Sequence, residues 1–486
     1  MRKRLKLSES GETMLQSRPM KLNENRFFSS DPSIRDLARS LYGEVKNLPI
    51  ISPHGHTDPR WYADDINFTN PTELFLIPDH YIFRMLYSQG VPLEDLGVPR
   101  VDGGPVEQDP LKIWKLFAKH YYLLRGTPSR MWFESMLTNL FGIGVRLSPE
   151  TADDIYAALQ TALNQPEFSI RKLYDRFNIE AISTTDSPLS DLAHHRSVRD
   201  SGWHGRIIPC FRPDPVVDPE YKGFPENVSE LGAITGESTA TWDGYLKALA
   251  LRREFFVSLG ATATDHGHPT AVTRDLTRTE CERLFTLAMK GEMTPQEAED
   301  FRGQMLTEMT KMSLDDGLII QIHPGSSRNH NELIFKRFGL DKGADIPMAT
   351  EYVRALKPLL NRFGNETRLK VILFTLDSST LGRELAPLAG HYPLLRLGPA
   401  WWFFDSPEGM MNFRRTVTET AGFYNTVGFN DDTRAFLTIP ARHDMARRID
   451  CAYLAGLVSE HKLDEDEALE VAHDLAYNLS KDAYNL

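Results

Sequence analysis

The pair His54 and His56 carries the clearest chemical signal in this sequence, because the two histidines flank one glycine at the end of an apolar run. Residues 48–53 read Leu-Pro-Ile-Ile-Ser-Pro, which is typical of a buried β-strand. Side chains at i and i+2 of an extended chain point to the same face, so both imidazoles would converge on one point. Neutral imidazole is the commonest nitrogen ligand of zinc and related divalent ions, so the pair predicts part of a metal site. A pair of turn histidines in a polar loop is the alternative interpretation.

Seven further short apolar runs, each followed by polar residues, predict the elements that would position such a site. Continuous apolar strands of this length are buried on both faces, as in parallel sheets, and helical patterns such as residues 349–363 lie between them. Eight strand–helix units, with the first strand counted, predict an α/β fold, a distorted TIM (β/α)8 barrel. The seven runs span residues 179–183, 207–211, 261–264, 318–322, 369–374, 394–397 and 426–429.

Asp432 and Arg434 follow the last predicted strand with the same spacing as the two histidines. In a TIM barrel the reactive residues lie at the carboxyl ends of the strands, and closure places the eighth strand beside the first. Asp432 would then face His54 and His56 and complete a His-His-Asp set for one divalent metal ion. His323, after the fifth strand, would point into the same space as a further ligand or as a hydrogen-bonding partner.

The predicted domains follow from the long connection after His56. About 120 residues separate it from the second strand, far more than a usual βα loop contains. We therefore expect a mostly α-helical insertion at 57–175, with helices such as 111–124 and 152–163. The barrel would comprise 48–56 and 176–486, with helical extensions at 215–259 and 276–312, and 1–47 would form an N-terminal tail and a helix that begins after Asp31.

The bulk composition narrows the function class. A net charge of −12 and a pI near 5.7 argue against a nucleic-acid-binding surface, which needs clustered Lys and Arg. The basic start Met1–Lys6 lacks an apolar stretch behind it, so we interpret it as a solvated tail rather than a signal peptide or membrane anchor. Three cysteines without CxxC spacing disfavour a disulfide framework or a thiolate metal site. The expected location is cytoplasmic.

Histidine pairs combined with a last-strand aspartate on a barrel resemble the amidohydrolase (metal-dependent hydrolase) superfamily. Within it, six separated motifs between about Leu22 and Leu486 occur in the order seen in uronate (glucuronate) isomerases. Their wording departs from the commoner family form at Pro78, after Ile322 and in Asp432-Thr433-Arg434-Ala435-Phe436, without loss of the polar side chains. The motifs are Asp79-His80-Tyr81 with Arg84, Arg212-Pro213-Asp214, Asp265-His266-Gly267, His323 with Arg328-Asn329, Trp401-Trp402-Phe403 and Asp432 to Phe436.

The resemblance implies an aldose–ketose isomerase that interconverts D-glucuronate with D-fructuronate and D-galacturonate with D-tagaturonate through a cis-enediol. No redox cofactor is needed. Asp432 would act as the base that transfers the proton of the sugar carbon. Tyr81 and Arg434 would move or stabilise a second proton between the sugar oxygens O1 and O2, and His80 would orient the sugar. A divalent ion, with zinc expected, would be held by His54, His56 and Asp432, although the isomerisation can be written without it.

The substrate carboxylate needs a planar bidentate donor. Arg212 is the best candidate and Arg328 the second, whereas Asp265 could hold a sugar hydroxyl or one of the histidines around the metal. His323 would also lie at the substrate. Arg212 could instead form a local salt bridge with Asp214. Trp401 and Trp402 are expected to pack at the barrel rim, because neighbours along a strand point opposite ways.

Two other function classes remain open at this point. A metal-dependent amidohydrolase or deaminase on the same barrel would use the last aspartate to take a proton from water. An enzyme of this class with two metal ions would typically require a bridging Lys or Glu after the fourth strand and a His after the sixth. This chain has Asp265 and Asp377 near these positions. A non-enzymatic sugar-acid-binding protein would need Arg212 and the metal but not the pair Tyr81 and Asp432. We expect a small-molecule sugar acid as the only partner besides further copies of the chain in a homo-oligomer, with neither nucleic acid nor membrane.

Overall fold

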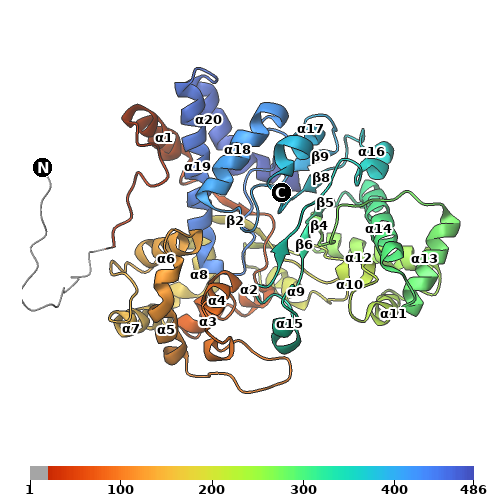
Figure 1. The fold of residues 1–486 in the computed structure, drawn as a ribbon, viewed down its shortest axis with the longest axis horizontal. Helices are drawn as coiled ribbons and strands as arrows, with labels where there is room; N and C mark the ends of the chain where they lie inside the picture. Colours follow the sequence, from red (N-terminus) through yellow and green to blue (C-terminus); the bar gives the residue numbers. More distant parts are fainter. Residues whose placement is uncertain (1–19) are drawn as a thin grey trace, which may run out of the picture.

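A computed structural model describes residues 20–486, so the start of the predicted tail, Met1–Lys6, lies outside the described residues. Two parallel sheets form the centre of the molecule (Figure 1), with the strand orders β1-β2-β3 and β4-β5-β8-β9. A short antiparallel pair, β6 and β7, forms a third sheet of two strands. The predicted α/β class with parallel strands is therefore confirmed. The strands are β1 (Ile50–Ser52), β2 (Ile179–Ser183), β3 (Arg206–Ile208), β4 (Ala263–His266), β5 (Ile319–Ile322), β6 (Ser326–Ser327), β7 (Ile346–Pro347), β8 (Val371–Leu373) and β9 (Leu395–Leu397).

Backbone contacts join the two sheets at Phe211. Its N–H donates to the carbonyl of Ala263 at 3.1 Å, and its carbonyl accepts from the N–H of Asp265 at 2.9 Å. The third predicted strand, 207–211, is interrupted before this contact. Pro209 lies in the gap and has no N–H to offer a ladder, so β3 ends at Ile208 and Phe211 makes only isolated bridges.

The last predicted strand, 426–429, is wrong as a regular strand. One bridge joins Thr426 to Leu397, and the N–H of Val427 donates to the carbonyl of Leu397 at 3.1 Å. Gly428 then adopts φ +75°, which an extended strand does not allow. Further along, the carbonyl of Thr433 accepts from the N–H of His56 at 3.1 Å, so the segment after Gly428 reaches the end of β1.

Every regular element between β1 and β2 is helical. The expected helix 152–163 has its predicted bounds, and 111–124 forms α5 followed by a 3-10 turn. These helices lie together at the lower left of Figure 1 and share one apolar core. They are α2 (Pro59–Asp64), α3 (Pro71–Phe75), α4 (His80–Tyr87), η1 (Glu94–Leu96), α5 (Pro110–His120), η2 (Tyr121–Leu124), α6 (Pro128–Asn139), α7 (Ala152–Leu163), η3 (Pro166–Phe168) and α8 (Ile170–Arg176).

The remaining helices surround the sheets. The helix expected after Asp31 forms as α1, with the Asp31 carboxylate accepting from the N–H groups of Ser33 and Ile34, and it packs on α19. The helix expected over 349–363 starts only at Lys357, because Pro358 belongs in a first helical turn and not further inside. The helices are α1 (Pro32–Val45), α9 (Ala193–Asp200), α10 (Asp214–Val217), α11 (Phe224–Thr235), α12 (Trp242–Ser258), α13 (Arg278–Lys290), α14 (Pro295–Asp316), α15 (Glu332–Phe338), α16 (Lys357–Phe363), η4 (Leu381–Leu385), α17 (Ala386–Ala389), α18 (Pro407–Ala421), η5 (Phe436–Thr438), α19 (Ile439–Ser459), α20 (Glu465–His473), η6 (Asp474–Asn478) and α21 (Leu479–Tyr484).

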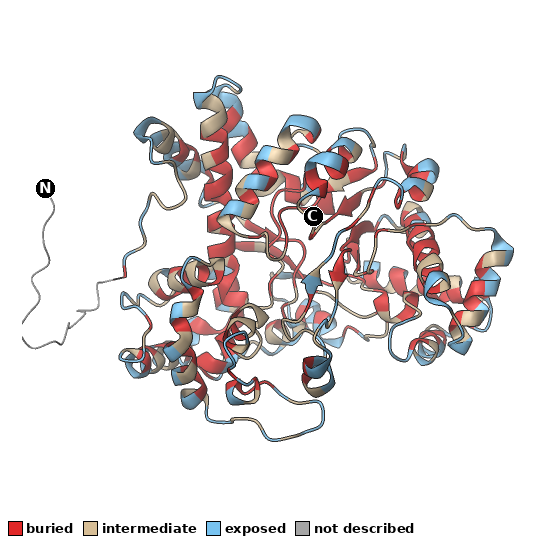
Figure 2. Ribbon diagram, in the orientation of Figure 1, coloured by how far each residue is buried: buried red, intermediate tan, exposed pale blue. Residues whose placement is uncertain are grey.

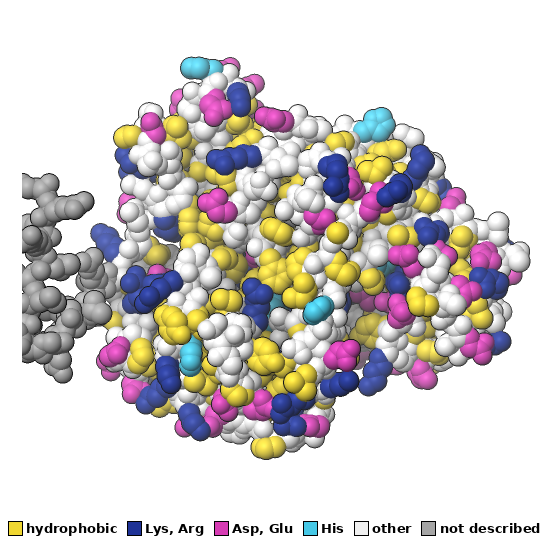
Figure 3. Space-filling model, in the orientation of Figure 1, with side chains coloured by type: hydrophobic (Ala, Val, Ile, Leu, Met, Phe, Trp, Pro, Cys, Tyr) yellow, Lys and Arg dark blue, Asp and Glu magenta, His cyan; other side chains and the backbone are white. Residues whose placement is uncertain are grey.

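Burial follows this arrangement. The strands of the two parallel sheets are largely buried, as are the inward sides of α14 and α19, whereas β7 and the outer helix faces are more exposed (Figure 2). On the face drawn in Figure 3, Lys and Arg side chains are interspersed with Asp and Glu. All three cysteines are free and buried. Within residues 20–486, no helix combines the length and the apolar character that a bilayer crossing requires.

Candidate functional site

A cleft of about 500 Å³ lies where the polar residues after the strands meet. It is large enough for a small-molecule ligand. Nine of the ten predicted site residues line it, and Asp265 is the exception. The nine are His54, His56, His80, Tyr81, Arg212, His323, Arg328, Asp432 and Arg434.

The predicted metal ligands converge in this cleft. Nε2 of His54 lies 3.5 Å and Nε2 of His56 lies 3.1 Å from Oδ1 of Asp432. The ligand atoms of the three residues all lie within 4.8 Å of one another. Two imidazoles and one carboxylate are a donor set that divalent zinc and related ions accept, so these residues fit a metal ion.

Asp432 adopts φ +41°, a left-handed conformation that is uncommon for residues other than glycine and concentrates at functional sites. The indole N–H of Trp401 donates to its second oxygen, Oδ2. The two oxygens therefore have separate surroundings, since Oδ1 faces the histidines and Oδ2 faces Trp401.

A chain of close polar contacts runs beneath the cleft from His323 to Arg212. Asp265 is fully buried, with Oδ1 2.7 Å from Nδ1 of His323 and Oδ2 2.9 Å from Nη1 of Arg212. Burial opposes ionisation of Asp265, but Arg212 and His323 hold its pKa well below its usual range. Of the two roles predicted for Asp265, this geometry favours holding a histidine rather than a sugar hydroxyl.

Arg212 presents one edge of its guanidinium to the cleft. Nε is taken by Asp214 at 2.9 Å and Nη1 by Asp265, so the predicted salt bridge with Asp214 is present. Nη2 points to Gly267, where a Cβ would lie 2.4 Å from this nitrogen and 3.0 Å from Nη2 of Arg328. Two guanidinium groups thus approach each other over a residue with no side chain, an arrangement suited to binding a carboxylate.

Gly267 itself went unnoticed as a functional residue, although it belongs to a predicted motif. We expect Gly267→Ala to raise KM for a carboxylate substrate about tenfold or more, because the added methyl would displace both arginines. Steady-state kinetics would show this, with thermal melting as the check on folding. Gly303→Ala offers a matched control, since its Cβ would crowd buried backbone away from the cleft. An unchanged KM for Gly267→Ala would contradict the proposed anion site.

His80 and Tyr81 lie in the first turn of α4, where the Asp79 carboxylate accepts from the N–H of Tyr81 at 2.9 Å. Burial lowers the pKa of His80 to about 4, with Arg434 adding to the effect, so its imidazole is neutral near pH 7. Burial also raises the pKa of Tyr81 well above its usual value, so its hydroxyl keeps the proton. That hydroxyl donates towards Asp405, whose oxygens lie 3.3 and 3.4 Å away.

Sequence reasoning missed Asp405 and Arg442, which support Tyr81. Nη1 of Arg442 donates to Asp405 at 3.0 Å, and its guanidinium lies 3.7 Å from the ring centre of Trp132. Asp405 follows the Trp401-Trp402-Phe403 motif closely, so its position was a usable signal. Arg442 carries no such signal, because the side chains that it connects, Asp405 and Trp132, come from distant segments.

Arg434 also has a partner that the sequence did not reveal. Its Nη2 donates to Asp341 at 2.8 Å, and both residues line the cleft. Burial would raise the pKa of Asp341, but Arg434 and Arg328 lower it. Asp341 follows α15 and lies 93 residues earlier in the chain, without a motif around it.

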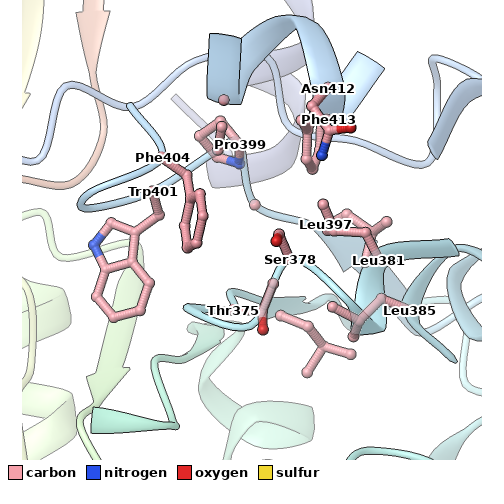
Figure 4. A pocket seen from close by; sticks show the side chains of 14 residues that line it. Thr375, Ser378, Leu381, Leu385, Leu397, Pro399, Trp401, Phe404, Asn412 and Phe413 are labelled. Atoms are coloured by element: carbon pink, nitrogen blue, oxygen red, sulfur yellow. The ribbon is translucent and has the colours of Figure 1, made fainter. Parts of the chain in front are cut away.

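The expectation that Trp401 and Trp402 point opposite ways is wrong. They lie in a turn, not in a strand, and both line the cleft with ring centres 5.8 Å apart. Trp401 also packs on His323, with ring centres 4.7 Å apart. Behind it, Leu397, Phe404 and Phe413 help to line a cavity of about 20 Å³, which is too small for a sugar acid (Figure 4).

His266 on β4 predicts a pH dependence of stability. Its burial, with His268 nearby, lowers the pKa to about 3, whereas an unfolded histidine titrates near 6.5. The unfolded chain therefore binds the extra proton between these values, and the free energy of unfolding falls as the pH decreases. We expect the wild type to lose about 2 kcal/mol more than His266→Gln between pH 7.5 and pH 5 in denaturant melts. Equal losses in wild type and His266→Gln would refute the assignment.

Comparisons with known proteins identify the family of this chain. Residues 20–484 match the family model described as glucuronate isomerase. A uronate isomerase of Rhizorhabdus wittichii is 61% identical over 96% of this chain and 99% of its own length, and that of Brucella melitensis biotype 1 is 61% identical over 96% and 100%. The crystal structure of a glucuronate isomerase from Caulobacter crescentus superposes with a TM-score of 0.95 at 57% identity, covering 96% of this chain and 98% of that one.

Solved structures with lower sequence identity also resemble this chain. A uronate isomerase from Thermotoga maritima has a TM-score of 0.89 at 28% identity, covering 96% of this chain and 100% of that one. A metal-dependent hydrolase from Lactobacillus casei, at 13% identity and a TM-score of 0.51 over 92% of this chain and 97% of that one, shares the fold alone. The match of the family model over nearly the whole described chain, together with relatives at 61% identity, shows that this chain belongs to the glucuronate (uronate) isomerase family.

Proposed function

We propose that the protein is an aldose–ketose isomerase that interconverts D-glucuronate with D-fructuronate and D-galacturonate with D-tagaturonate through a cis-enediol. The observation that carries the proposal is one cleft that joins a His-His-Asp cluster to two converging arginines. The cluster suits the reacting end of the sugar, and the arginines suit its carboxylate.

A closed architecture would explain this convergence. The two sheets, joined at Phe211 and continued by Thr426, would form one distorted (β/α)8 barrel that closes where His56 contacts Thr433. In this division, residues 1–47 are the N-terminal tail and helix, 48–56 with 176–486 the barrel, and 57–175 the helical insertion that supplies His80 and Tyr81.

The metal ion would be held by His54, His56 and Asp432, with zinc expected. When bound, a divalent ion supplies positive charge that stabilises the negative charge developing on the substrate oxygens. His323 stacks on His54, with ring centres 4.6 Å apart, and its contact with Asp265 favours a supporting role.

In the forward reaction Oδ2 of Asp432 would take the proton from C2 of the aldose and later return it to C1. The Tyr81 hydroxyl would give its proton to O1 and take one from O2, which balances the transfer. Arg434, held by Asp341, would stabilise the enediolate charge between these events. The neutral His80 imidazole can both donate and accept a hydrogen bond, so it suits orientation of the sugar hydroxyls.

The substrate carboxylate would bind between Arg212 and Arg328. The chain Arg212–Asp265–His323 then connects the carboxylate end of the substrate with the histidines at the reacting end. This fixed spacing would place C1 and C2 against Asp432 for a six-carbon acid.

Incubation with glucuronate and galacturonate in D2O tests the proposal. Ketose should form with solvent deuterium at the exchanged carbon, unless one shielded base returns the same proton. Failure of folded, metal-loaded protein to form ketose from either sugar would remove the assignment, and turnover of N-acyl or cyclic amides instead would favour the hydrolase alternative. The named activity of relatives at 61% identity favours the isomerase.

We also propose that the protein acts in the cytoplasm, since its three cysteines are free. We further propose that it forms a homo-oligomer, because barrels with large helical additions commonly associate. Light scattering behind a sizing column would measure the mass directly. A mass near 55.3 kDa would contradict the oligomer.

A further inference from the structure

The segment that carries Asp432 receives little support from the neighbouring strand. After the contact of Val427 with Leu397, residues 428–431 make no strand ladder among the described residues. A catalytic carboxylate nevertheless needs a fixed position, so other contacts must hold this segment.

The helix α21 makes those contacts. Oγ of Ser480 donates to the carbonyl of Val427 at 3.0 Å and lies 3.4 Å from that of Phe429. Gly428 permits the approach, because a Cβ there would lie 2.7 Å from Oγ of Ser480 and 2.9 Å from the carbonyl oxygen of Leu475. In Figure 1 the end of the chain lies over the strands at the centre of the view.

Tyr484, at the end of α21, connects β5 with the segment that carries Asp432. Its fully buried hydroxyl accepts from Nδ2 of Asn430 at 2.6 Å and donates to Oε1 of Gln321 at 2.9 Å. Burial raises the pKa of Tyr484 well above its usual value, so the donated proton is retained.

Gln321 and Asn430, which Tyr484 connects, each lie at the same distance along the chain from a residue of the site. Gln321 precedes His323 by two residues, and Asn430 precedes Asp432 by two residues. Gln321 also donates to the carbonyl of Thr264 at 3.3 Å, just before Asp265. The three amide and hydroxyl side chains thus form a polar layer on the segments that carry His323, Asp265 and Asp432.

We propose that Tyr484 is a positioning residue that sets the distance between the segment bearing Asp432 and β5, and thereby the metal and substrate geometry of the site. The inference rests on the proposed role of Asp432. Removing the hydroxyl would leave the Asn430 amide and the Gln321 carbonyl without this partner inside the protein, and the segment would shift to find others.

The test compares Tyr484→Phe with Tyr477→Phe. Tyr477 is a matched control on the same part of the chain, since its hydroxyl donates to Glu180 at 2.5 Å and accepts from Lys481 at 3.0 Å, away from the cleft. We expect Tyr484→Phe to weaken Zn²⁺ binding by the metal-free full-length chain about tenfold, measured by chelator competition, and to lower kcat/KM about tenfold. Tyr477→Phe should keep both values within twofold of wild type even if its melting temperature falls by a similar amount.

Zn²⁺ affinity and kcat/KM within twofold of wild type for Tyr484→Phe would overturn the inference, as would equal losses in the two variants. If Tyr484→Phe does not fold, Asn430→Ala decides by the same two measurements. Asp432→Asn separates this inference from the proposed function. Retained Zn²⁺ binding and turnover in Asp432→Asn would refute the site itself, whereas their loss there beside an unaffected Tyr484→Phe refutes only the positioning role.

Discussion

Replacing Asp432 with asparagine should lower kcat/KM for glucuronate at least a thousandfold and weaken Zn²⁺ binding. Asparagine is nearly isosteric, but it cannot accept a proton from C2, and general-base catalysis contributes about 10² to 10⁴ in rate. It also removes the negative charge that both histidines face, at 3.1 and 3.5 Å from Oδ1. Steady-state kinetics and chelator competition measure the two effects separately.

Asp218→Asn is the matched control for this variant. Asp218 lines the same cleft but pairs with Arg302 at 2.9 Å, away from the histidine cluster. Its replacement should change kcat/KM less than about threefold, as expected for removing one partly exposed ion pair. An Asp432→Asn enzyme that still isomerises at more than a tenth of the wild-type rate would show that another group moves the proton.

The second large effect is expected for Arg212→Lys, which should raise KM for both uronates about a hundredfold. Lysine cannot match the planar fork of arginine, which donates to Asp214 and Asp265 while its Nη2 remains for the substrate. Loss of one partner of a buried charge pair costs about 2–5 kcal/mol of binding free energy. A loss of about 3 kcal/mol corresponds to a hundredfold weaker affinity. Saturation kinetics should show the loss mainly in KM.

The same change at position 328 provides the comparison. Arg328 is more exposed, and within residues 20–486 its one ion pair is with Asp345, at 3.4 Å, so Arg328→Lys should raise KM less than tenfold. A larger effect at 328 than at 212 would reverse the assignment of the primary carboxylate donor. Equal and small effects would place the carboxylate elsewhere in the cleft.

Local patterns predicted much of the architecture. Apolar runs that end in polar residues identified β2 and β5 nearly to the residue, and the helix 152–163 appeared with its predicted bounds. The fourth strand, predicted at 261–264, lies two residues later as β4. Two other errors came where one residue interrupts an apolar run. Pro209 splits the third strand and Gly428 ends the last one, since the first lacks a donor and the second adopts φ +75°.

Partners of the site residues were harder to predict than the residues themselves. Asp341 reaches Arg434 across 93 residues, and Arg442 reaches Asp405 across 37. Trp401 was interpreted as packing, yet its indole N–H donates to Asp432. Such contacts depend on loop paths, which no spacing of residues in the sequence encodes.

The sequence by itself determined the chemistry that this protein has available. Two imidazoles at i and i+2 must share a face of an extended chain, and the residue types at 80, 81, 212 and 432 limit what can donate, accept or carry charge. Only the tertiary structure decided which of these groups meet. It buries Asp265 between His323 and Arg212, leaves Nη2 of Arg212 facing Gly267, and places Tyr484 between the segments that carry His323 and Asp432. The physical reason is that a side chain's function depends on distances of about 3 Å between segments far apart in sequence, and packing of the whole chain sets those distances.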